Sequence, residues 1–79
     1  MDLTEKYLTE GKTFSLSFYE CEHDGDADNY RDDIRDSGGK ITGTKLNYDA
    51  ETCTIDVQVS NYNTFMNKFK KTDAYQFLN

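Results

Sequence analysis

Residues 53–69 constrain the fold of this chain more than any other stretch, because two different hydrophobic periods follow each other there. Apolar residues first alternate with polar ones, the period-two pattern of a strand with one buried face. These residues are Cys53, Ile55, Val57 and Val59. A second set then recurs at the spacing of one α-helical face: Tyr62, Phe65, Met66 and Phe69. The stretch predicts a half-buried strand and then an amphipathic helix capped by Ser60 or Asn61.

The residues before this stretch predict a strand, a helix and a second strand. Residues 12–22 form the strand, with Phe14, Leu16 and Phe18 alternating with hydroxyl-bearing residues. A loop over residues 23–26 leads to a helix over about residues 27–36, with Asp26 as N-cap. Ser37, Gly38 and Gly39 end this helix.

The second predicted strand covers residues 40–48, and its alternation is broken. Ile41 has one parity, Leu46 and Tyr48 have the other, and Gly43 lies between them. We therefore predict a β-bulge at Gly43, which returns Ile41 to the face of Leu46. A hairpin loop over residues 49–52 joins this strand to the next, and residues 74–78 predict a short last strand at an edge.

The order strand–helix–strand–strand–helix–strand predicts an α+β fold in one domain, residues 1–79. This βαββαβ order is that of ferredoxin-like folds, in which two helices cover one face of a four-stranded antiparallel sheet. The first and third strands would be central. The alternative is βαββα, with the tail helical or loose. A short helix-like segment over residues 2–10, with Leu3, Tyr7 and Leu8, comes first.

The two cysteines and the N-terminus predict a cytoplasmic protein. No stretch is long and apolar enough to span a membrane, and the N-terminus lacks the basic and apolar regions of a signal peptide. With regular alternation, Cys21 lies on the face opposite Phe18, whereas Cys53 shares the face of Ile55. The thiols would then point to opposite faces, which predicts free thiols in a reducing compartment.

Charge is concentrated in one part of the chain. Residues 20–36, which we call the acidic segment, sum to −6, and the rest of the chain is balanced. Its acids, the candidate partner-binding residues, are Glu20, Glu22, Asp24, Asp26, Asp28, Asp32, Asp33 and Asp36. One interpretation is a solvated face that keeps a small protein soluble. The other is a surface for a basic partner.

The helical spacing of three acids favours the second interpretation. Asp28, Asp32 and Asp36 stand at i, i+4 and i+8, where like charges repel and destabilise a helix. Their pitch of about 6 Å is of the same order as the charge spacing along a nucleic-acid strand. Such a row could occupy a groove lined with Lys and Arg, although Arg31 and Arg35 partly relieve the repulsion.

Metal binding has weaker support. Asp24, Asp26 and Asp28 match the start of an EF-hand loop. Asn29 stands where that loop requires Gly, and Arg35 stands where it requires Glu. A second candidate, Cys21 with His23, falls short of a four-ligand set. We predict no metal and no cofactor.

No catalytic motif is present, so we predict that the protein is not an enzyme. Cys21 and His23 lack an orienting third group and an oxyanion loop. Direct nucleic-acid binding is also disfavoured, because the one basic cluster is Lys68, Lys70 and Lys71.

In its small size, acidity, lack of Pro and richness in Tyr, Asn and Asp, the chain resembles the small inhibitors that phages and mobile elements encode, such as anti-CRISPR proteins and other nucleic-acid mimics. The resemblance implies a stoichiometric inhibitor, monomeric or weakly dimeric, in the host cytoplasm. Its acidic face would dock on the nucleic-acid-binding surface of a basic host protein. The alternative, from fold analogy, is a ferredoxin-like regulatory module that binds a ligand or metal.

Overall fold

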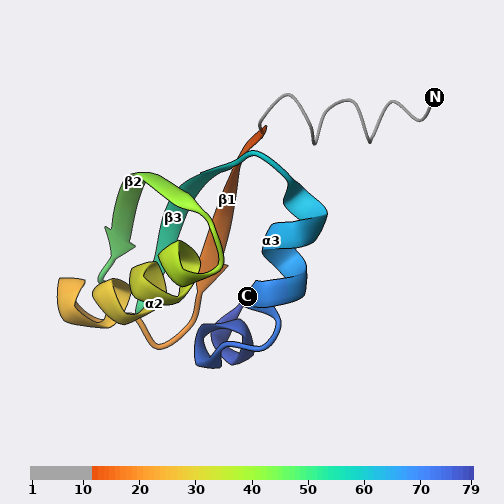
Figure 1. Ribbon diagram of the computed structural model, residues 1–79. Coiled ribbons are helices and arrows are strands. Elements are labelled where there is room, and N and C mark those ends of the chain that lie inside the picture. The colour runs from red at the N-terminus through yellow and green to blue at the C-terminus, as the bar shows by residue number, and fades with distance from the viewer. Residues whose placement is uncertain (1–11) are drawn as a thin grey trace.

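The computed structural model describes residues 12–79 and shows a small α+β fold (Figure 1). The elements are β1 (Lys12–Phe18), α2 (Asp24–Asp36), β2 (Lys40–Asn47), β3 (Thr52–Val59), α3 (Tyr62–Phe69) and a 3-10 helix, η1 (Asp73–Phe77). The strands form one antiparallel sheet in the order β1-β3-β2. The helix-like segment predicted over residues 2–10 lies outside the described residues.

The core lies between one face of the sheet and the two helices. Phe14 pairs with Val57, Leu16 with Ile55, and Phe18 with Cys53, so the apolar faces of β1 and β3 coincide. The helices bury Ala27, Tyr30, Ile34, Phe65 and Phe69 in the same cluster. α3 runs along β1, where Phe65 and Tyr62 meet Phe14 edge to face. The periodic segments thus predicted which side chains build the core.

Strand β2 contains the predicted bulge. Its register on β3 shifts between Ile41 and Gly43. Ile41 opposes Val57 and Leu46 opposes Cys53, so both partly buried side chains pack against the core. The hairpin turn occupies residues 48–51, one position earlier than expected.

Helix α2 begins earlier than predicted. Asp24 is its first residue and His23 is the N-cap, so the assignments of a loop over residues 23–26 and of Asp26 as N-cap were wrong. The carboxylate of Asp26 instead accepts the backbone amides of Glu22 and His23, at 3.0 and 3.4 Å, from inside the first turn. The predicted end is confirmed, because Gly38 adopts a φ of 96°, which favours glycine.

The predicted fourth strand over residues 74–78 is absent, and η1 takes its place. The amide of Ala74 donates to the Asp33 carboxylate at 3.0 Å, which holds the start of η1 against α2. After η1, one antiparallel bridge joins Leu78 to Phe18 at the end of β1. The alternative order βαββα with a helical tail therefore describes the observed elements, and β3 alone is central among the described strands.

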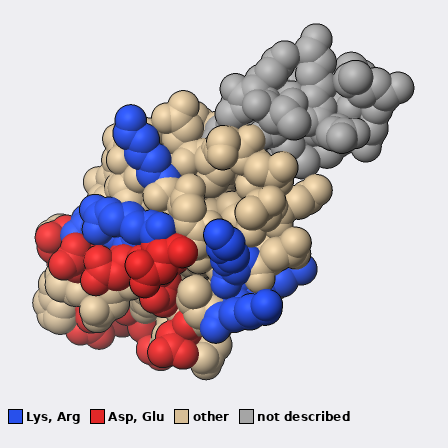
Figure 2. All heavy atoms as spheres, in the orientation of Figure 1, with Lys and Arg blue, Asp and Glu red and all other residues tan. Residues whose placement is uncertain are grey.

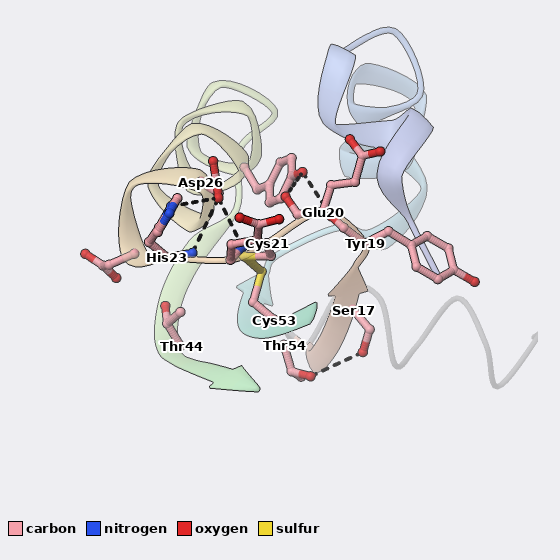
Figure 3. The surroundings of a disulfide bond; sticks show 12 residues. Ser17, Tyr19, Glu20, Cys21, His23, Asp26, Thr44, Cys53 and Thr54 are labelled. Carbon is pink, nitrogen blue, oxygen red and sulfur yellow. Dashed lines mark hydrogen bonds and ion pairs between the residues drawn. A yellow bond between two sulfur atoms is a disulfide. The ribbon is translucent and has the colours of Figure 1, made fainter. Parts of the chain in front are cut away.

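The prediction of free thiols was wrong, because Cys21 and Cys53 form a disulfide (Figure 3). Strand β1 ends at Phe18, and Glu20 turns the chain with a φ of 51°. This turn breaks the alternation and brings Cys21 back to the core side, with its Cα 5.6 Å from that of Cys53. Disulfides persist mainly in oxidising compartments, so one basis of the cytoplasmic prediction is lost.

None of the helices in the described part of the chain is long and apolar enough to cross a membrane.

Candidate acidic binding surface

The acidic segment comprises the loop before α2 and the whole of α2. In Figure 2 the red acidic side chains gather over α2 with blue basic side chains beside them, and further blue side chains lie toward α3. Six of the eight carboxylate residues are exposed, and Asp26 and Asp33 are half-buried. Their surroundings differ enough to divide them into three groups.

In the first group, the two arginines of α2 contact three carboxylates. Arg31 contacts Asp24 at 3.2 Å and Asp28 at 3.1 Å, and it also donates to the Thr44 hydroxyl on β2 at 3.1 Å. Its side chain is only 13% exposed. The hydrogen bond to Asp24 is the main cause of a raised Arg31 pKa, so this side chain stays charged. Arg35 pairs with Asp32 at 3.4 Å.

The second group holds backbone amides. Asp26 accepts the amides before α2 and also lies 3.1 Å from Nδ1 of His23. Asp33 accepts the amide of Ala74. Asp26 thus accepts hydrogen bonds at the N-terminus of α2 and Asp33 at the N-terminus of η1, where an anion is favoured.

The third group consists of Glu20, Glu22 and Asp36, which have no ion pair within residues 12–79. The predicted row of Asp28, Asp32 and Asp36 therefore does not repel as three bare charges, because arginines hold the first two. Glu20, Glu22 and Asp36 thus supply half of the net charge of −6 from the two ends of the acidic segment.

A hollow of about 510 Å³ separates α2 from η1. Carboxylates of Glu20, Asp26, Asp32, Asp33 and Asp73 line it. Tyr30 and Phe77, whose ring centroids are 5.7 Å apart, supply an apolar wall. Sequence reasoning missed Asp73, because it lies far from the acidic segment in the chain and reaches the hollow only through the docking of η1.

Glu20 and Phe77 also line a second hollow of about 520 Å³. Tyr19, Glu51 and Gln76 also line it. We call the two hollows together the acidic groove. Among the described residues, its lining contains no Lys, Arg or His.

Asp26 and Glu20 place negative charge around the Tyr30 hydroxyl at the groove. Burial raises the pKa of its phenol, and the charges of Asp26 and Glu20 raise it further. The neutral hydroxyl donates to the carbonyl oxygens of Tyr19 and Glu20, at 3.0 and 3.1 Å. The groove therefore disfavours a further negative charge and favours a cation.

The side chains considered for metal binding have other partners. Arg31 holds Asp24 and Asp28, and Cys21 is in the disulfide. Within residues 12–79, no group of three or more His, Cys, Asp and Glu residues is placed to hold a metal ion.

Comparisons with known proteins supply no relative from which a function could be transferred. No family model, curated protein or solved structure matches the chain. The chemistry of the acidic surface is therefore the basis for a functional conclusion.

Proposed function

We propose that this protein is a non-catalytic binding protein that presents its acidic surface to a basic protein partner. The observation that carries the proposal is the distribution of charge: the net charge of −6 arises in the acidic segment. Carboxylates are exposed there, and some have no internal cation among the described residues. Complementary charge of this kind steers association with a basic surface.

The partner that fits best is a host protein with a nucleic-acid-binding surface, which the protein would block stoichiometrically. Such surfaces are lined with Lys and Arg, and carboxylates on a helix can occupy part of the phosphate path. This is the inhibitor class suggested by the resemblance to anti-CRISPR proteins. In a cytoplasmic setting the disulfide would have to resist reduction, and burial of both sulfurs limits the access that thiol exchange needs.

The alternative of a ferredoxin-like regulatory module has less support. It was based on a four-stranded sheet, and the described residues form three strands.

The test compares two variants that lose the same charge. The first replaces Asp28, Asp32 and Asp36 with Asn. The control replaces Asp2→Asn, Glu5→Gln and Glu10→Gln, outside the acidic segment. Each immobilised protein is incubated with host lysate at low and high salt, and the bound proteins are eluted with competing DNA or RNA.

We expect the parent and the control to retain a basic nucleic-acid-binding protein at low salt and to release it to the competitor. The acidic-segment variant should retain less of it, with a weaker dependence on salt. Its free energy of unfolding should change by less than about 0.5 kcal/mol, because exposed ion pairs contribute little. Equal retention by all three proteins would show that the acidic segment is not the binding surface.

A further inference from the structure

Resting on this proposed function, we infer that the basic partner binds in the acidic groove, and not on the outer face of α2, where Arg31 contacts Asp24 and Asp28. The groove would take arginine side chains from an arginine-rich segment of that partner. Charge, wall chemistry, backbone conformation and rigidity each support this inference.

The two sides of α2 differ in how their carboxylates are paired. On the outer side, Arg31 already occupies the carboxylates of Asp24 and Asp28, and Glu22 and Asp36 have no ion pair within residues 12–79. On the groove side, Arg35 pairs with Asp32. In the groove, Glu20, Glu51 and Asp73 have no ion pair within the described chain. An incoming cation therefore gains attraction in the groove without displacing an internal one.

The wall chemistry favours arginine over lysine. Phe77 is half-buried and lines both hollows, and Tyr19, which is 49% exposed, lines the second. A guanidinium group is planar, stacks on aromatic faces and bonds carboxylates through two donors at once. An ammonium group is more strongly hydrated and has no flat face to stack.

The backbone conformation at the groove is unusual. Glu20 and Glu51 have positive φ values of 51° and 55°, the only non-glycine residues to do so in the described chain. Both line the second hollow. Glycine would adopt these turns at a lower energy, by about 1 kcal/mol or more. The turn itself therefore does not account for a glutamate at either position.

Hydrogen bonds hold the walls in place before any ligand arrives. The Tyr19 amide donates to the carbonyl of Phe77 at 2.7 Å, and the Cys21 amide donates to that of Glu51 at 2.9 Å. Together with the contact between Asp33 and Ala74, these bonds join the loop before α2 to the hairpin turn and to η1. A preformed site loses less entropy on binding.

A second copy of the chain is a less suitable occupant. Its one cluster of exposed lysines within the described residues is Lys68, Lys70 and Lys71, on α3 and just after it. Each copy carries a net charge of −6, so two copies repel as they approach.

The test is a calorimetric titration with hexa-arginine and hexalysine peptides at low salt. The groove variant carries Glu20→Gln, Glu51→Gln and Asp73→Asn. The matched outer variant carries Glu22→Gln, Asp28→Asn and Asp36→Asn, none of which lines the groove. Both variants lose three charges, and circular dichroism with denaturant unfolding confirms that they fold.

We expect the groove variant to bind hexa-arginine about tenfold more weakly than the parent, or worse. The outer variant should lose much less affinity, because its charges act on the bound peptide only at longer range. Hexa-arginine should bind the parent more tightly than hexalysine, and Phe77→Leu should narrow that difference. Equal weakening in both variants would overturn the groove while leaving the broader acidic-surface function intact.

Two other results would overturn the inference. One is a parent that binds neither peptide, in which case the lysate experiment still judges the proposed function independently. The other is self-association of the parent that depends on salt in ultracentrifugation. If the groove variant and a Lys68→Gln, Lys70→Gln, Lys71→Gln variant both lost this self-association, the occupant of the groove would be a second copy of the chain.

Discussion

Reduction of the disulfide is expected to remove a large part of the stability of this domain. The bond joins residues separated by 32 positions. By chain entropy alone, closing a loop of that size stabilises the folded state by about 3.7 kcal/mol, because it restricts the unfolded chain. A domain of this length has a total free energy of unfolding of roughly 4 to 12 kcal/mol. The disulfide therefore accounts for a large share of the free energy of unfolding.

The measurement is guanidinium unfolding of the parent with and without a reductant, followed by circular dichroism. We expect reduction to lower the free energy of unfolding by about 3 to 4 kcal/mol. The melting temperature should fall by roughly 15 to 30 °C. The double variant Cys21→Ala, Cys53→Ala is the control, since it should be less stable than the parent and should not respond to the reductant.

A parent whose unfolding midpoint is the same in both conditions would refute this reasoning. So would two reactive thiols per chain in unfolded, non-reduced protein. The second result would also mean that Cys21 and Cys53 point to opposite faces, as regular alternation predicts.

Three further predictions concern single side chains. Gly39→Ala should lower the free energy of unfolding, measured in urea, by about 1 to 3 kcal/mol, because the new methyl would lie 2.7 Å from Ile34 Cγ2 and 2.8 Å from Val57 Cγ1. The control is Gly25→Ala, whose new methyl meets nothing within 4 Å and should not destabilise the protein. Asp33→Ala should destabilise by about 1 kcal/mol and speed hydrogen exchange at the Ala74 amide, and unchanged protection there would contradict the contact. The raised Tyr30 pKa contributes stability that is fully present below about pH 10 and is lost as pH rises through the folded-state pKa. The free energy of unfolding of a Tyr30→Phe variant should therefore fall less steeply with rising alkaline pH than that of the parent. An equally steep fall in both proteins would contradict this prediction.

Local patterns predicted the parts of the fold that local physics determines. The period of β3, the apolar stripe of α3 and the bulge at Gly43 all depend on neighbouring residues, and all are present. The cap of α3 is confirmed in the same way, because the Asn61 side chain accepts the Thr64 amide at 3.0 Å.

The failures have a common cause in contacts between distant residues. Residues 73–77 form a 3-10 helix, whose first turn is held by Asp33 from α2. No local pattern contains that partner, so the alternation of the tail suggested a strand. The left-handed turn at Glu20 is equally invisible, because nothing in the residue type requires it, and it reversed the predicted side of Cys21.

The candidate site was predicted only in part. The acidic segment could be read from charge alone, but the division of its carboxylates into paired, structural and uncompensated groups depends on side-chain geometry. Glu51 and Asp73 join Glu20 only after the hairpin turn and η1 come together. A groove assembled from three distant segments has no signal in any one of them.

The disulfide also closes a covalent ring that contains α2, β2 and the hairpin turn over residues 48–51. All four residues of this turn are exposed, and exposed turns are where proteases commonly cut. A single cut there leaves two fragments still joined through Cys21 and Cys53, which separate on a gel only after reduction. The ring thus holds the fragment that bears α2 to the fragment that bears β3, even after the backbone is broken.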